Sequence, residues 1–437
     1  MSSDNLTNSS EAPGSSALIR LLQKIVDVRA EEVRALFLGF IYFFLILSSY
    51  YVIRPIRDDF GVAGGVENLP LMFTATLLVM LIANALFSSL VARFSRRRFI
   101  PIAYRFLIAN LLIFFVLLLV ISKAHQVWLG RAFFVWTSVF NLFVVSVFWA
   151  FMVDVFNTDQ GKRLFGFISV GGTLGAIVGA ALTATLVRKV GTLYLLLIAA
   201  VLLELGAQCV RRFPTPSDTK RPESPVGGSI WAGIAHSFRS PYLLGICAYM
   251  LLYSITSTIL YFQQVGIAAR VFTDRAARTA FFAEVDLVVN ILTILAQLFI
   301  TGRLLKWFGV GATLAILPAL SVLGFISIGI APALTLLVVF LTLRRAGNFA
   351  FARPARETLF TVISREDKYK AKNAIDTVVY RTGDQIGAWL DPISRWLGLG
   401  FTGFSFVAAP LAAVWLFVSL WLGKKQVTMA SEVPGDA

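Results

Sequence analysis

Few side chains in this chain can bind a metal ion or act as a nucleophile. The 437 residues include only two cysteines and two histidines. Cys209 and Cys247 flank a long polar segment, where a disulfide is not expected, and two thiols make no metal site without further ligands. His125 and His236 lie far apart in sequence. With no nucleophile–base pair to add, the sequence predicts no metal, no cofactor and no enzyme activity.

Charged residues are also scarce, at 14% of the chain, whereas 57% of the residues are hydrophobic and the mean hydropathy is +0.78. These values argue against a soluble fold of this length. Twelve apolar stretches alternate with the charged segments, most of them near the roughly 20 residues that cross a hydrocarbon core. They are 36–53, 69–90, 99–121, 128–152, 164–187, 193–210, 242–262, 280–300, 310–330, 334–351, 374–396 and 401–422. We therefore predict an all-α polytopic membrane protein with twelve transmembrane helices.

The basic residues decide the predicted orientation. The formal net charge is +15, and most Lys and Arg lie in the N-terminal segment and in alternate loops, such as the arginines at 96–98 and the pair Lys424 and Lys425. This asymmetry follows the positive-inside rule and predicts that both termini are cytoplasmic. The charge therefore indicates an anionic inner lipid leaflet as partner, and no nucleic acid.

The longest polar interruption, residues 213–240, contains four prolines and divides the twelve stretches into six and six. Two six-helix halves joined by a linker are typical of the major facilitator architecture. The predicted organisation is a cytoplasmic tail with an amphipathic helix (1–34), a first half (35–212), a cytoplasmic linker (213–240), a second half (241–423) and a cytoplasmic tail (424–437).

An internal repeat supports the two halves. A shift of about 207 residues places the charged segment 159–163 on 366–370, and one residue more places Gly175 and Gly179 on Gly383 and Gly387. The run around Gly172 lacks the Lys-Ser/Thr of a phosphate loop, so we interpret these glycines as sites of close helix packing.

Three segments carry a family resemblance. They are YYVIRPIRD at 50–58, FWAF at 148–151 followed by GKRLFG at 161–166, and KYKAKN at 368–373 followed by Asp376, Tyr380 and Arg381. They resemble motifs of the ATP/ADP translocases of plastids and intracellular bacteria, and of shorter relatives in free-living bacteria. The resemblance implies an exchanger of nucleotides or other phosphorylated metabolites on a major facilitator-like fold, in a bacterial inner membrane.

The chain departs from that family at two charged positions. Thr137 stands where the translocases carry an acidic residue in the fourth span, and the seventh span reads YSITST at 253–258 in place of a Glu-x-x-Trp-Lys element. The cation of the first span is kept as Arg57.

Polar residues inside the spans are the candidate substrate-binding residues, because a charge in the bilayer persists only where it is paired, hydrated or bound to something. The candidates are Tyr50, Arg54, Arg57, Asp286, Asn290, Arg344, Arg345, Asn348, Tyr380 and Arg381. Arg54 and Arg57 share a helical face and could grip phosphate oxygens, with Tyr50 nearby for a base. Alternatively, both lie at the outer interface and pair with Asp58 and Asp59.

Three further helices have polar stripes. Asp286, Asn290, Thr293 and Gln297 indicate either a wet cavity or hydrogen bonds between helices. Arg345, Asn348 and Arg356 are predicted to lie near one face of the tenth span. Arg381 could pair locally with Asp384.

Charged residues at the predicted cytoplasmic ends of the helices are interpreted as a gate. They are Asp159, Lys162, Arg163, Arg356, Glu357, Glu366 and Lys370, and we expect them to form salt bridges when that side is closed.

These features predict a secondary transporter that moves a phosphorylated anion, with nucleotides the leading candidates, by alternating access. One alternative is a proton-coupled transporter of a smaller organic anion, with Asp286 carrying the proton. The other is a non-transporting membrane scaffold or sensor that keeps the fold.

Overall fold

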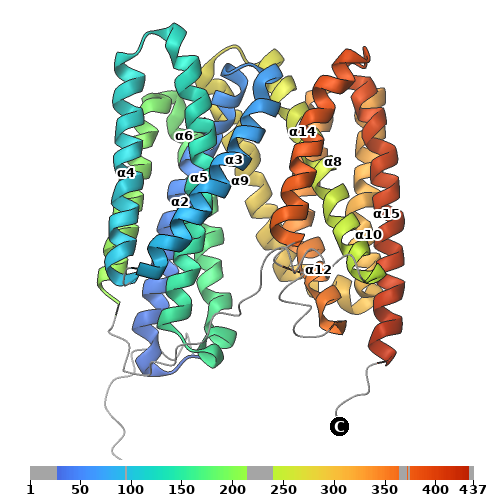
Figure 1. Ribbon diagram of the computed structural model, residues 1–437, viewed down its shortest axis with the longest axis horizontal. Coiled ribbons are helices and arrows are strands. Elements are labelled where there is room, and N and C mark those ends of the chain that lie inside the picture. The colour runs from blue at the N-terminus through green and yellow to red at the C-terminus, as the bar shows by residue number, and fades with distance from the viewer. Residues whose placement is uncertain (1–26, 94–95, 214–239, 364–371, 373–374, 433–437) are drawn as a thin grey trace, which may run out of the picture.

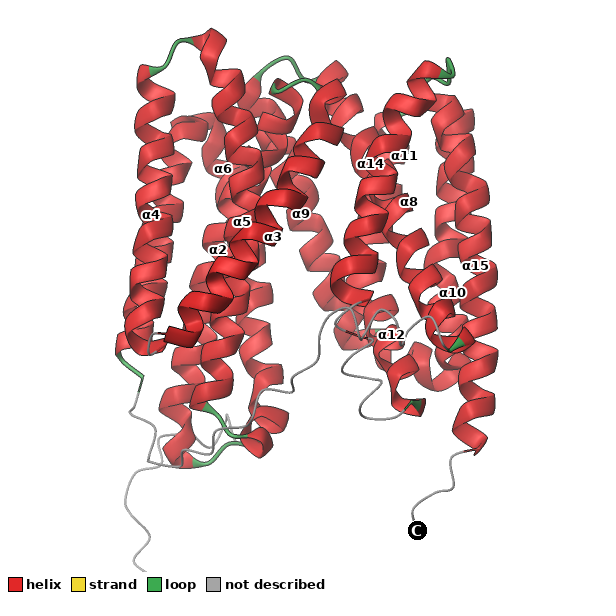
Figure 2. Ribbon diagram, viewed as in Figure 1, coloured by secondary structure: helices red, strands yellow, loops and turns green. Residues whose placement is uncertain are grey.

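The computed structural model describes residues 27–93, 96–213, 240–363, 372 and 375–432. Every regular element in this part of the chain is a helix (Figure 2). Most of the predicted tail with its amphipathic helix (1–34), most of the linker at 213–240, and the gate residues Glu366 and Lys370 lie outside the described residues.

The first half consists of five long helices, each a run of helical backbone hydrogen bonds. They are α2 (Val33–Ala63), α3 (Leu69–Arg93), α4 (Arg96–Val120), α5 (Lys123–Val155) and α6 (Thr158–Arg211), with short 3-10 turns η1 (Ala30–Glu32) and η2 (Val66–Asn68) around α2. Gly191 has a φ of 81° within α6 and divides it into two helices, because only glycine adopts that conformation without strain.

The second half contains two π-helical turns in addition to its α-helices. It comprises α8 (Pro241–Val271), α9 (Arg275–Phe299), α10 (Thr301–Ile330), α11 (Leu334–Gly347), the π turn η3 (Asn348–Ala352), α12 (Arg353–Leu359), η4 (Phe360–Val362), the π turn η5 (Ile375–Val379), α14 (Tyr380–Trp396) and α15 (Phe401–Glu432). The last helix therefore continues past the predicted boundary at residue 424. In Figure 1 the two halves stand side by side, with α9 next to the first half.

Nine helical ranges within the described residues are long and apolar enough to cross a membrane. Two of them, Arg163–Arg211 and Arg275–Ile330, contain 49 and 56 residues. At about 1.5 Å per residue each would exceed twice the roughly 30 Å of a hydrocarbon core. The chain is a multi-pass helical membrane protein.

We call the side where α2 begins and α15 ends the termini side, and the other the opposite side (Figure 1). On the termini side Glu32 accepts hydrogen bonds from Arg163 at 2.9 Å and Gln160 at 2.8 Å, both in the first turns of α6. Burial acts to raise the pKa of Glu32, but these hydrogen bonds outweigh it and the pKa is lowered. The start of α2 is thereby fastened to α6.

Glycines bring the equivalent helices of each half into backbone contact. A methyl group on Gly175 or Gly179 of α6 would overlap the carbonyl oxygen of Phe44 or Ser48 on α2. On Gly383 or Gly387 of α14 it would lie 2.9 Å from a carbonyl oxygen of α8, that of Leu251 or Ile255 respectively. The packing interpretation of the repeated glycines is confirmed.

We expect Gly175→Leu to destabilise the protein by about 3 kcal/mol or more, because the α2 backbone cannot move aside as a side chain could. Gly166→Leu is the matched control on the same helix, since nothing lies within 4 Å of the added carbon there. Thermal unfolding of both variants in detergent tests this. Equal melting temperatures would show that the contact does not limit the fold.

Candidate functional site

A buried carboxylate joins arginines from both halves. Arg54 on α2 lies 3.0 Å from Oδ1 of Asp286 on α9, and Arg345 on α11 lies 2.7 Å from the same oxygen. Asp286 is 2% exposed. Its other oxygen, Oδ2, is buried and has no hydrogen-bond partner among the described residues. One anionic group thus accepts from two cations, one contributed by each half.

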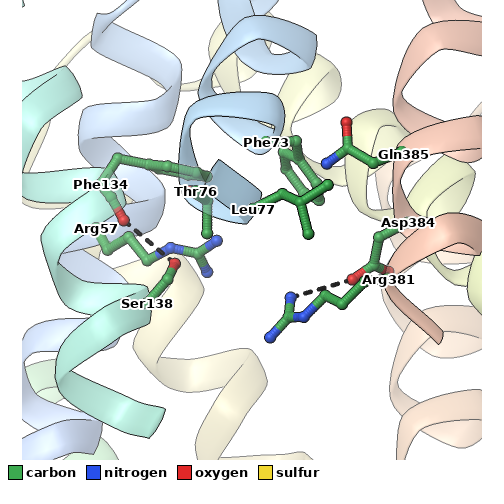
Figure 3. A pocket seen from close by; sticks show the side chains of 9 residues that line it. All are labelled: Arg57, Phe73, Thr76, Leu77, Phe134, Ser138, Arg381, Asp384 and Gln385. Carbon is green, nitrogen blue, oxygen red and sulfur yellow. Dashed lines mark hydrogen bonds and ion pairs between the residues drawn. The ribbon is translucent and has the colours of Figure 1, made fainter. Parts of the chain in front are cut away.

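One helical turn further along α2, Arg57 lines a small cavity of about 30 Å³ between the halves (Figure 3). The cavity is lined by Arg57, Phe73, Thr76, Leu77, Phe134, Ser138, Arg381, Asp384 and Gln385. The Arg57 guanidinium lies 4.0 Å from the ring centroid of Phe134. Figure 3 shows Arg57 and Arg381 pointing toward each other from opposite walls. The cavity therefore combines cations with aromatic rings.

On the second-half wall of the cavity, Asp384 binds side chains of α8 and α14. This carboxylate pairs with Arg381 at 3.3 Å and accepts hydrogen bonds from Ser254 at 2.7 Å and Thr258 at 3.2 Å, both on α8. The local Arg381–Asp384 pair is confirmed. Because α14 packs on α8 through its glycines, these hydroxyls lie close enough to orient the carboxylate.

The alternative that places Arg54 and Arg57 at the outer interface stays a prediction; α2 itself continues as a helix through Pro55 to Ala63. The ion pairs predicted by that alternative are present for Arg57 but not for Arg54. Arg57 lies 3.4 Å from Asp58, which also accepts from the Tyr261 hydroxyl at 2.9 Å. Arg54 instead pairs with Asp286.

A second junction between the halves lies toward the opposite side. Asp59 on α2 is fully buried and accepts hydrogen bonds from Arg275 and Arg278 of α9, each at 2.8 Å. The Arg275 guanidinium also lies 4.1 Å from the ring centroid of Phe60. We call Asp59, Arg275 and Arg278 the latch. From sequence these two arginines looked like ordinary loop charges.

Arg344 and Arg345 are neighbours in sequence, but their side chains lie in different regions of the protein. Arg344 is 3% exposed and donates to hydroxyls inside the second half, on Thr256 at 2.7 Å and on Ser257 and Ser321 at 2.9 Å. No carboxylate pairs with it among the described residues. Arg344 is not among the residues that line the cavity.

The predicted common face of Arg345, Asn348 and Arg356 is wrong. Residues 11 apart on an α-helix are about 20° out of register. The π turn Asn348–Ala352 has more residues per turn than an α-helix and so changes the register of the residues beyond it. Arg345 consequently faces α9, whereas Arg356 contacts the Met250 sulfur of α8 and lies 3.4 Å from Asp376.

The remaining candidates lie near these groups. Tyr50 is part-buried on α2 one turn before Arg54, and its ring centroid is 5.4 Å from that of Tyr51. Asn290 is buried one turn after Asp286, and its Nδ2 has no partner among the described side chains. Tyr380 packs beside Tyr253, with centroids 6.4 Å apart. Sequence reasoning missed Phe73 and Phe134, because a cavity-lining aromatic residue looks like any other apolar residue of a span.

Comparison with known proteins adds independent evidence. Residues 35–355 match the family model described as Major Facilitator Superfamily. The chain belongs to the Major Facilitator Superfamily. Among solved structures of this fold, a POT family transporter in complex with 5-aminolevulinic acid aligns with a TM-score of 0.65 at 12% identity, covering 90% of this chain and 96% of that one. An inward-facing, unoccupied bacterial homologue of the human lysosomal transporter Spinster gives 0.58 at 14% identity, covering 94% and 100%.

The proteins similar in sequence belong to the family that the motifs resemble. ADP,ATP carrier protein 1 of Chlamydia muridarum is 24% identical over 340 residues, which cover 68% of this chain and 64% of that protein. ADP,ATP carrier protein 2 of Chlamydia pneumoniae is 26% identical over 228 residues, covering 45% and 41%. The chain spans slightly less than two thirds of the first of these relatives. The resemblance to the ATP/ADP translocases on a major facilitator fold is confirmed.

In this Major Facilitator Superfamily member, the described gate residues form pairs within their own halves. Arg163 pairs with Glu32 of the first half, and Arg356 with Glu357 and Asp376 of the second, where Lys372 also pairs with Glu357. Asp159 lies in the first turn of α6, and the side chain of Lys162 is outside the described set. The gate therefore stays a prediction.

The ion pairs that join the halves in the described part of the chain share one helix of the second half. They are Arg54–Asp286, the latch pairs, and Arg188–Glu284 at 3.7 Å, and each involves α9. Thr74 of α3 adds a hydrogen bond to Gln385 of α14 at 2.9 Å. Tyr261 of α8 also donates to Asp58 of α2, so helices α8, α9 and α14 hold the second half against the first.

Proposed function

We propose that the protein is a twelve-helix secondary transporter that moves a phosphorylated anion by alternating access, with nucleotides as the leading candidates. The observation that carries the proposal is the charge balance at the interface between the halves. Arg54, Arg57, Arg345 and Arg381 meet three carboxylates there, those of Asp58, Asp286 and Asp384. Part-buried cations in excess of their carboxylate partners are costly, and a bound anion relieves that cost.

Phosphate suits these arginines better than a single carboxylate does. A guanidinium donates two parallel hydrogen bonds to phosphate oxygens, and arginines from both walls can contact one group. Phe73 and Phe134 line the same cavity and provide ring faces for a base. The names of the Chlamydia relatives, ADP,ATP carrier proteins, point to the same class of substrate.

The count of twelve follows from dividing the two longest ranges. Arg163–Arg211 and Arg275–Ile330 each contain two crossings, separated near Gly191 and near residues 300–309. Helix α14 adds the twelfth crossing. It is too polar to be counted among the nine ranges by its hydropathy. The basic loops orient the termini side toward the cytoplasm of a bacterial cell. Reporters fused after Arg98 and after Lys425 should both report cytoplasm, and one after Ser122 should report the outside.

Ligand stabilisation tests the substrate directly. Purified protein in detergent is heated with ADP, ATP, a sugar phosphate or a dicarboxylic acid, each at matched ionic strength. A ligand at 100 times its Kd stabilises the folded state by about 2.7 kcal/mol, so a true substrate raises the melting temperature. We expect the nucleotides to give the largest shift. A shift with the dicarboxylic acid alone would favour the organic-anion alternative, and no shift with any anion would favour the scaffold.

A further inference from the structure

Asp286 occupies the position where an anionic substrate would bind. Its Oδ1 accepts from Arg54 at 3.0 Å and from Arg345 at 2.7 Å, so one carboxylate oxygen already fills the space between the two guanidinium groups. The side chain is 2% exposed, and the two arginines are 20% and 19% exposed. The protein therefore carries its own anion between two cations proposed to bind substrate.

The two contacts of Asp286 differ in what happens to them when the halves move. Asp286 and Arg345 both belong to the second half, on α9 and α11, so their pair can persist during a rigid movement of that half. Arg54 belongs to the first half, on α2. The Arg54–Asp286 contact crosses the interface, so relative movement of the halves at this level breaks it.

Breaking that contact without a replacement is unfavourable. It would leave the part-buried guanidinium of Arg54 without its carboxylate, in a region where solvent cannot fully compensate. A phosphate group offers several oxygens to the same guanidinium and can replace the carboxylate. Asp286 would remain paired with Arg345, so the displaced carboxylate is not left alone.

We propose that Asp286 is a built-in counter-anion that the substrate displaces from Arg54, and that this displacement couples substrate binding to reorientation of the carrier. The empty carrier is held in place by the Arg54–Asp286 contact, and the loaded carrier is released from it. Transport then takes the form of exchange, because an empty carrier returns slowly. This inference rests on the proposed function and assigns the coupling to one residue.

The test compares exchange, which is efflux driven by external substrate, with leak, which is efflux in its absence. Proteoliposomes are loaded with radiolabelled ADP, and efflux is measured into buffer with or without external ADP. In the wild type we expect fast efflux only with external ADP. In Asp286→Asn the neutral side chain no longer holds Arg54, and efflux without external ADP should rise about tenfold, within the usual range of coupling between sites. Asp286→Glu keeps the charge and should remain coupled.

Glu284→Gln is the matched control, because Glu284 is another acidic residue of α9 that pairs across the interface, at 3.7 Å from Arg188, but is exposed. It should leak no more than the wild type. If Asp286→Asn does not fold, the double variant Asp286→Asn, Arg345→Gln removes the charge pair as a unit and should show the same leak.

The outcomes separate the two proposals. Wild-type exchange together with an unchanged, low leak in the folded Asp286 variants would overturn the coupling role and leave the transporter proposal standing. A wild type that exchanges neither ADP nor any other loaded phosphorylated anion would overturn the proposed function, and the coupling role with it.

Discussion

Replacing Asp59 with asparagine should open the opposite side of the bundle. Asp59 is fully buried, and it is the shared carboxylate partner of Arg275 and Arg278 across the interface. Loss of its charge leaves two cations of α9 facing a neutral amide. We expect a cost of about 3 kcal/mol to the closed arrangement, at the low end for a buried pair because Arg275 keeps a third of its side-chain surface in solvent.

A cysteine at Thr76 makes this opening measurable. Thr76 is 7% exposed and lines the cavity. In a background with Cys209 and Cys247 replaced by serine, a membrane-impermeant maleimide added outside the cell should label Thr76→Cys slowly, and at least tenfold faster once Asp59→Asn is added. Glu67→Gln is the control, since Glu67 is an exposed acidic residue near the same end of α2. Equal labelling with and without Asp59→Asn would mean that the latch does not control access.

Substitutions of Arg57 should weaken substrate binding in the order wild type, Lys, Gln. Lysine keeps the charge but loses the planar fork and its stacking on Phe134, 4.0 Å away. Glutamine loses the charge as well. Because hydrogen bonds to charged groups contribute about 1.5 to 3 kcal/mol, we expect the Kd for ADP to rise roughly tenfold or more in Arg57→Gln.

Melting curves recorded at increasing ADP concentration give both Kd and stability for each Arg57 variant. Arg395→Gln serves as the control, because Arg395 is exposed on α14, pairs with Asp391 and does not line the cavity. A lower melting temperature in Arg57→Gln with an unchanged Kd would make Arg57 a purely structural partner of Asp58.

Hydropathy and local spacing predict what depends on near neighbours in the chain. Apolar length predicts the helices, because every span must satisfy its own backbone in lipid. The repeated glycines predict the α2–α6 and α8–α14 contacts, because only a residue without a side chain admits a second backbone. The Arg381–Asp384 pair is predicted because residues three apart share a helical face.

Partners distant in the sequence are not predictable in this way. Nothing local in the sequence distinguishes Asp286 or Asp58 as the carboxylate for Arg54, because the choice depends on how α2 and α9 pack. Arg344 and Arg345 look equivalent in a charged run, yet one is buried among hydroxyls and the other reaches the interface. Helical periodicity also fails after Asn348, because a π turn leaves no trace in a hydrophobic pattern.

Both π turns in the described chain lie in the second half, one between α11 and α12 and one directly before α14. Helices bend most readily at such turns. Arg345 lies on α11 before the first turn and Asp384 on α14 after the second, whereas the short helix Arg353–Leu359 lies beyond the first turn. The short helix α12 on the termini side can therefore tilt at the first π turn without displacing Arg345 from the interface between the halves.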